Sequence, residues 1–85
     1  MIRVERRNQN EFLVVVEEGA SRTEHIVTLD EEYYEKLTGK GISKEELIER
    51  SFEFLLAREP KESILQSFNL KVISRYFPEY EKTIM

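Results

Sequence analysis

The sequence has 85 residues, of which 40% are hydrophobic and 35% charged, so it suits one domain and argues against wholesale disorder. Its 13 basic and 17 acidic residues give a net charge of -4, which argues against a protein that binds nucleic acid through bulk positive charge. There is no cysteine, which excludes disulfides and thiolate metal sites.

No signal peptide or membrane segment is predicted. Residues 1–10 lack the apolar stretch of a signal peptide. The longest apolar run, from Phe12 to Val16, falls far short of the roughly 20 residues that cross a bilayer. We therefore expect a cytoplasmic protein with no membrane partner.

Three β-strands are predicted before residue 30, at about 2–7, 11–17 and 22–29. The first and third alternate apolar and polar residues, which is the pattern of a half-buried strand. The second is rich in valine and is apolar on both faces. Gly19 supplies a hairpin turn between the second and third strands. We expect an antiparallel meander, whose apolar face needs a cover to be stable.

Two helices are predicted next, at about 31–38 and 44–58. Gly39 lies just past the first, where a left-handed cap residue is expected. Ser43 and Glu46 have the spacing of a capping box at the start of the second. The apolar stripe of this second helix is broad, which indicates burial against the sheet and against a second surface. Its members are Leu47, Ile48, Phe52, Phe54, Leu55 and Leu56.

Two shorter helices are predicted at about 61–68 and 70–77. Pro60 suits the first position of a helix, and Asn69 can end one helix and cap the other. Pro78 ends the last turn, and a tail follows that Tyr80 and Ile84 could dock. The predicted fold is α+β: an N-terminal antiparallel meander of about three strands, then about four helices packed on one face, in a single small domain.

The helix pair within residues 58–77 has the order of a helix-turn-helix, which we weigh as a DNA reader. The turn between Phe68 and Ile73 is very tight, and it leaves the second helix only about two turns long. The exposed face of that helix offers few basic side chains, whereas a protein that binds DNA specifically contacts many phosphates. We interpret the pair as helices that close the core.

Residues 23–59 run in the order strand, short helix, loop, longer helix, which resembles the ribbon-helix-helix regulators. That resemblance implies a dimer in which two chains pair their strands and the strand side chains enter the major groove. One strand face would present Arg22, Glu24, Ile26 and Thr28, and the other Thr23, His25, Val27 and Leu29. Glu24 would repel phosphates, and the second face is largely apolar. A dimeric, antitoxin-like DNA-binding regulator is the alternative function.

No catalytic, cofactor or metal site is predicted. His25 is the only histidine, and neither a nucleophile nor a set of further ligands is spaced to work with it. The three glycines form no phosphate-binding loop. Neighbouring acidic residues are explained as turn and helix-start residues. We expect a protein that is not an enzyme and needs neither cofactor nor metal.

The aromatic residues of the first predicted helix and of the C-terminal segment exceed what one small core needs. They are Tyr33, Tyr34, Tyr76, Phe77 and Tyr80. They either lie at the border of the core with their hydroxyls in water, or they form a protein interface, where tyrosine is enriched. Both interpretations stay open at this stage.

Arg3, Arg6 and Arg7 form the only basic cluster, and Arg22 can lie beside it across the sheet. This cluster either faces solvent and discourages edge-to-edge aggregation or forms a patch that meets an anion or a partner. We expect a small, non-enzymatic protein-protein interaction module. Its partner would be another protein or a second copy of the chain, with nucleic acid as the less favoured partner.

Overall fold

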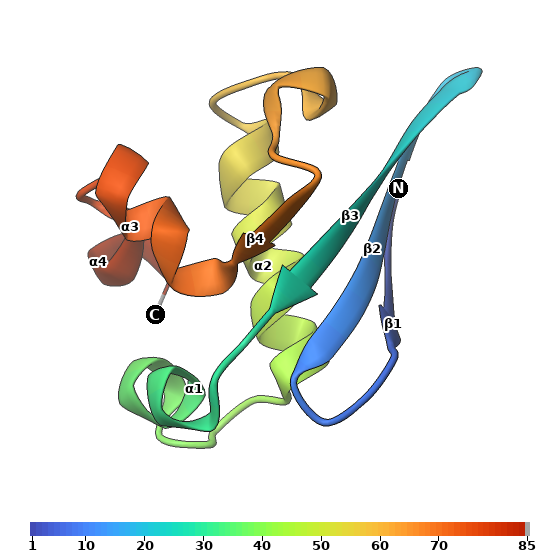
Figure 1. Ribbon diagram of the computed structural model, residues 1–85. Coiled ribbons are helices and arrows are strands. Elements are labelled where there is room, and N and C mark those ends of the chain that lie inside the picture. Colours follow the sequence, from blue (N-terminus) through green and yellow to red (C-terminus); the bar gives the residue numbers. More distant parts are fainter. Residues whose placement is uncertain (85) are drawn as a thin grey trace.

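The computed structural model describes residues 1–84 and confirms the predicted α+β fold (Figure 1). Three strands, β1 (Ile2–Arg6), β2 (Glu11–Glu18) and β3 (Ser21–Thr28), form the predicted antiparallel meander. A fourth strand that was not predicted, β4 (Ser67–Asn69), pairs parallel to β3 and gives the order β1-β2-β3-β4.

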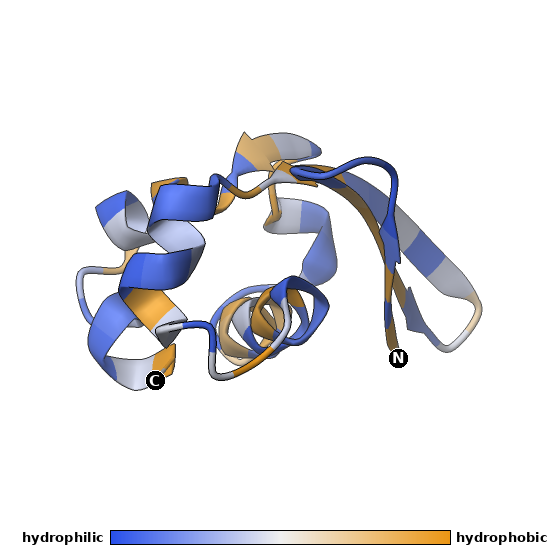
Figure 2. Cartoon of the chain, turned by 90° about the horizontal axis from the view of Figure 1, so that it is seen from below, coloured by the Kyte–Doolittle hydropathy of each residue, from blue (hydrophilic) through white to orange (hydrophobic). Residues whose placement is uncertain are grey.

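The helices gather on one face of the sheet (Figure 2), and the side chains on this face are mainly apolar and buried. Phe12, Val14 and Val16 of β2 are fully buried there, as alternate residues of a strand must be when one face packs on a core. The pairing register places Val27 opposite Phe12 and His25 opposite Val14. The charged residues of the meander lie mainly on the other face.

Two glycines with positive φ fix the ends of elements. Gly19, at φ 61°, is the first residue of the two-residue turn between β2 and β3. Gly39, at φ 60°, follows the first helix and donates its N–H to the Glu35 carbonyl, as its predicted cap role requires. Both positions favour glycine because a Cβ is strained at these angles.

The first two helices begin where local sequence patterns place them. They are α1 (Glu31–Thr38) and α2 (Lys44–Leu56). Ser43 Oγ accepts a hydrogen bond of 3.0 Å from the Glu46 N–H, so the predicted cap of α2 is present. Helix α2 ends two residues before the predicted position. At Pro60 the backbone has already adopted an extended conformation.

The predicted helix at 61–68 is wrong. A single 3-10 turn, η1 (Lys61–Ser63), forms there, and the chain then extends into β4. The Gln66 carbonyl accepts a hydrogen bond of 2.7 Å from the Ile26 N–H, and β4 continues this pairing along the edge of β3. The distant strand satisfies backbone groups that a helix would satisfy locally, so Ile64, Leu65 and Phe68, although they have helical spacing, do not form a helix.

The predicted helix at 70–77 is present in two parts, a 3-10 turn η2 (Leu70–Val72) and a short helix α3 (Ile73–Tyr76). Asn69 caps it by accepting a hydrogen bond from the Lys71 N–H. The predicted tail contains a further short helix, α4 (Tyr80–Ile84). Within residues 1–84, every helix is too short or too polar to span a bilayer.

Helix α2 is buried on two sides, as its broad apolar stripe indicated. On the sheet side, the Phe52 ring centroid lies 5.4 Å from that of His25. On the other side, the Phe54 ring lies 5.7 Å from Phe77 and 5.2 Å from Tyr80. The C-terminal segment of the same chain therefore packs on the side of α2 that faces away from the sheet. This side of α2 is not available to a partner.

Candidate functional site

Three of the five aromatic residues considered either for the core edge or for an interface lie in the core. Tyr33, Tyr34 and Tyr80 are 8%, 9% and 0% exposed. Each hydroxyl has a partner in the same chain: Glu81 Oε2 at 2.8 Å, the Ile42 carbonyl at 2.6 Å and Ser51 Oγ at 2.6 Å, respectively. These three tyrosines therefore join elements of the fold and offer little surface to a partner.

Burial raises the pKa of two of these phenols. It raises the pKa of Tyr80 to about 12. Burial, and then the hydrogen bond to Glu81, raise the pKa of Tyr33 well above its ordinary value. Both hydroxyls are hydrogen-bond donors near neutral pH.

Tyr76 and Phe77 lie at a surface depression that we call the apolar groove. It has a volume of about 370 Å³, and only one of its ten lining residues is charged. Leu55, Ile64 and Ile73, which are buried, form its floor. Its rim carries Leu65, 48% exposed, and Tyr76, 68% exposed. Apart from Met1, these are the large hydrophobic side chains most exposed within residues 1–84.

The walls of the apolar groove are fixed by aromatic contacts to α2. Phe77 lies edge-on to Phe54, with ring centroids 5.7 Å apart. Phe68, which also lines the groove, has its ring centroid 6.1 Å from that of Phe52. Such contacts hold ring positions from one side, so the groove is preformed and does not need to be ordered by a ligand.

Glu59 is the charged residue that lines the apolar groove. The adjacent Arg58 is engaged elsewhere: its guanidinium stacks 3.6 Å from the Phe54 ring centroid, donates to the Phe54 carbonyl and pairs with Glu79 at 3.3 Å. The groove therefore combines an apolar interior with one carboxylate at its margin.

The four arginines predicted as a basic patch are exposed, but each lies beside a glutamate. Arg3 pairs with Glu5 at 3.0 Å and Glu17 at 3.8 Å, Arg6 with Glu45 at 3.4 Å, Arg7 with Glu11 at 3.7 Å and Arg22 with Glu24 at 2.5 Å. Arg6 lies on the same sheet face as α2, whereas Arg3 and Arg22 lie on the opposite face. The structure does not bring them together as one phosphate-binding surface.

A second depression, which we call the acidic groove, lies between β1 and the exposed side of α2. It is lined by Val4, Ser43, Glu45, Glu46, Glu49, Arg50 and Glu53 and has a volume of about 480 Å³. Arg50 pairs with Glu46 at 2.6 Å. Sequence analysis missed this groove, although the spacing of Glu45, Glu49 and Glu53 placed them on one helix face.

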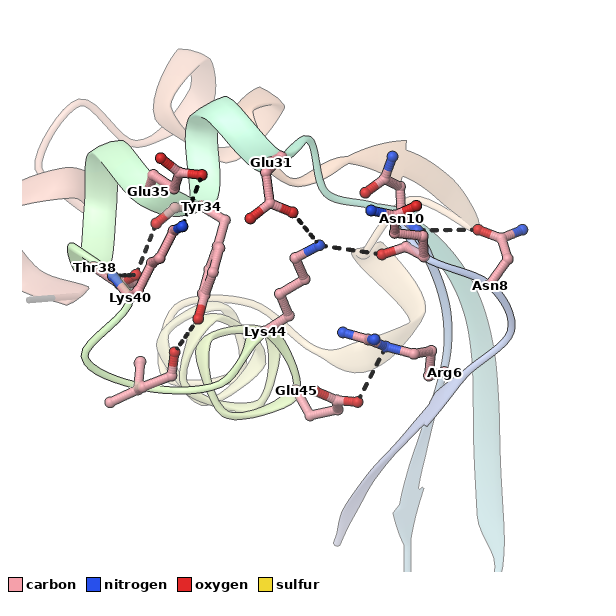
Figure 3. Close-up of polar contacts among 12 residues, drawn as sticks. Arg6, Asn8, Asn10, Glu31, Tyr34, Glu35, Thr38, Lys40, Lys44 and Glu45 are labelled. Carbon is pink, nitrogen blue, oxygen red and sulfur yellow. Dashed lines mark hydrogen bonds and ion pairs between the residues drawn. The ribbon is translucent and has the colours of Figure 1, made fainter.

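A buried polar junction joins α1, α2 and the β1–β2 turn (Figure 3). Lys44 is 7% exposed, and its Nζ lies 2.7 Å from Glu31 and donates to the Gln9 carbonyl at 3.2 Å. The ammonium also lies 5.6 Å from the centre of the Tyr34 ring. These contacts join α1, the start of α2 and the β1–β2 turn through one lysine side chain.

His25 is buried and has two hydrogen-bond partners. The Leu65 carbonyl only accepts, so Nδ1–H donates to it, at 2.8 Å, and Nε2 lies 2.8 Å from Thr23 Oγ1. Its ring therefore fastens β3 to the segment before β4. Among residues 1–84, no cluster of three or more His, Asp or Glu side chains is arranged to hold a metal ion.

The strand of the ribbon-helix-helix resemblance is β3, and it lies inside the sheet. It pairs with β2 along one edge and with β4 over Ile26–Thr28 along the other. Chain-to-chain pairing of ribbons needs a free strand edge. The geometry of β3 therefore does not favour the regulator.

Comparison of this chain with protein-family models, with curated proteins and with solved structures gives no match.

Proposed function

We propose that this chain is a small, cytoplasmic, non-enzymatic interaction module that binds a short apolar segment of another protein in the apolar groove. The observation that carries the proposal is that Leu65 and Tyr76, both exposed, line the same depression as the buried apolar residues Leu55, Ile64 and Ile73. Exposed apolar residues gathered at one concave site are typical of binding surfaces.

The size of the groove favours a short segment over a second copy of the chain. Stable protein interfaces bury about 1,200–2,000 Å² in total. The apolar groove offers a few side chains, and the broad apolar face of α2 is already covered by Phe77, Tyr80 and Ile84. A foreign segment that inserts two or three side chains fits this surface better than a symmetric dimer does.

The chemistry of the lining indicates the kind of segment. The aromatic rings of Phe68 and Phe77 suit aliphatic or aromatic side chains, and tyrosine, the residue at position 76, is one of the types enriched at binding hot spots. Glu59, at the margin, suits a lysine or arginine beside the apolar residues. We therefore expect a partner segment with bulky apolar residues and a neighbouring basic one.

The proposal is tested by quantitative affinity purification from cells of the source organism. Four tagged chains are compared: wild type, Leu65→Ser, Tyr76→Ser and the control Lys82→Ser, which alters an exposed residue of α4. We expect at least one protein that wild type and Lys82→Ser retain equally and that both groove variants lose by about tenfold, because truncating a hot-spot residue costs that much or more.

Thermal unfolding of each chain checks that the groove variants remain folded. We expect them to, because the substituted residues Leu65 and Tyr76 are exposed. The proposal fails if all four chains retain the same proteins. It also fails if the partner that depends on the groove is a second copy of this chain, which light scattering would show as a dimer lost in Tyr76→Ser.

A further inference from the structure

The outer edge of β1 is free. Among residues 1–84, β1 pairs with β2 alone. Met1 and Glu17 exchange two backbone hydrogen bonds, of 2.6 and 2.8 Å, and the Arg7 N–H donates to the Glu11 carbonyl at 2.8 Å. The direction of the backbone groups alternates along an antiparallel strand. The backbone N–H and C=O groups of Arg3 and Glu5 therefore also point toward β2. The N–H and C=O groups that point outward belong to Ile2, Val4 and Arg6.

A strand added at this edge would lie above the acidic groove. The side chains of Ile2, Val4 and Arg6 are on the sheet face that meets α2, and Arg6 already reaches Glu45 at 3.4 Å. A neighbouring strand lies only about 4.8 Å farther out. Every second side chain of that strand would therefore extend toward the exposed side of α2.

The spacing of the carboxylates on α2 matches that of an extended chain. Glu45, Glu49 and Glu53 follow one another at four-residue intervals, so they rise by about 6 Å per step. Alternate side chains of a strand are separated by about 6.7 Å. Three consecutive inward side chains of an added strand can thus each lie near one of these carboxylates.

The negative charge of the acidic groove favours a basic partner segment over a second copy of this chain. Its lining has four carboxylates and one guanidinium, a formal charge of -3. Two copies paired edge to edge through β1 would bring two such grooves together, which like-charge repulsion opposes. A segment with lysine or arginine at alternate positions would instead neutralise the groove.

We infer that β1 binds an extended basic segment of a partner protein as a fifth strand, with alternate lysine or arginine side chains over Glu45, Glu49 and Glu53. The backbone groups of Ile2, Val4 and Arg6 supply the main-chain hydrogen bonds, as in other cases of strand addition. The acidic and apolar grooves share no lining residue, so this site is independent of the proposed function.

The inference is tested by nuclear magnetic resonance titration of the ¹⁵N-labelled chain with three capped peptides of about eight residues. One alternates lysine and valine, one alternates glutamate and valine, and one has the first composition with all lysines in one block. We expect the alternating basic peptide to bind best and to slow hydrogen exchange at the amides of Ile2, Val4 and Arg6. The affinity should fall as salt is added.

A double variant, Glu49→Gln with Glu53→Gln, should weaken binding of the alternating basic peptide by about fivefold, the loss expected for two exposed ion pairs. The matched control, Glu32→Gln with Glu35→Gln, alters two exposed acids of α1 and should leave binding unchanged. The inference is overturned if the three Ile2, Val4 and Arg6 amides keep their exchange rates. It is also overturned if the block peptide binds as well as the alternating one, which would show attraction by charge without strand pairing.

Discussion

The Tyr80 hydroxyl lies 2.6 Å from Ser51 Oγ, and both residues are fully buried. Ser51 Oγ donates its own proton to the Leu47 carbonyl at 2.7 Å, so the tyrosine is the donor in the pair. This bond fastens α4 to the middle of α2. It shows that the C-terminal residues complete the core of the chain from which they come.

Removing this bond should lower stability modestly. We expect Tyr80→Phe to reduce the free energy of unfolding by about 1 kcal/mol, since the variant keeps the ring and loses one buried hydrogen bond. Tyr80→Ala should cost about 3–5 kcal/mol because it also leaves a cavity beside Phe54. Urea denaturation measures both values. Tyr76→Phe, at an exposed tyrosine, is the control and should change the value by less than about 0.5 kcal/mol.

Tyr80 should also make stability depend on alkaline pH. Its folded-state pKa is raised to about 12, above the ordinary value of 10, so the folded chain holds this proton more tightly than the unfolded chain. The resulting stabilisation is complete below pH 10 and is lost as the pH rises toward 12. The difference in unfolding free energy between wild type and Tyr80→Phe should therefore shrink over this interval. A difference that stays constant from pH 9 to 12 would contradict the assignment.

The Lys44 ammonium should control the titration of Glu31. The hydrogen bond from Lys44 lowers the pKa of the Glu31 carboxyl below 4.5, so the charged pair stabilises the fold above that pH and is lost as the pH falls through the folded-state pKa. We expect Lys44→Met to raise the Glu31 pKa toward its ordinary value, measured by carbon-13 resonance of the carboxyl. Lys36→Met, at an exposed lysine of the same region, should leave it where it is. An unchanged Glu31 pKa in Lys44→Met would show that the ion pair is absent in solution.

Hydrogen exchange at the amides of β3 can test whether β4 pairs with this strand. The amides of even-numbered residues in β3 point away from β2. Ile26 N–H bonds to the Gln66 carbonyl, whereas Glu24 lies beyond the reach of β4. We expect the Ile26 amide to exchange slowly and the Glu24 amide to exchange much faster. Equal rates would mean that β4 does not pair with β3 and would restore a free edge to that strand.

Sequence reasoning succeeded where structure depends on neighbours along the chain. The capping pair Ser43 and Glu46, the turn at Gly19 and the alternation in the meander are local patterns, and each is present as predicted. It failed for residues 61–68, because pairing with β3 decides the conformation there and its partner Ile26 is far away in the sequence.

The candidate site was predictable only in part for the same reason. Tyr76 and Tyr80 look alike in the sequence, yet one is 68% and the other 0% exposed, because the docking of α4 on α2 buries only the second. Leu65 lies in the segment wrongly predicted as the helix at 61–68, and in the structure it is 48% exposed and lines the apolar groove. The stripe of Glu45, Glu49 and Glu53 was visible in the sequence, but its place beside a free strand edge was not.

The most direct test of the central claim is photo-crosslinking in cells of the source organism, with a photoreactive amino acid at position 76 and, as the control, at position 82. The account predicts one covalent adduct with a foreign protein at position 76, absent at position 82 and lost when Leu65→Ser is added. Adducts that are the same at both positions, or that contain only further copies of this chain, would contradict it.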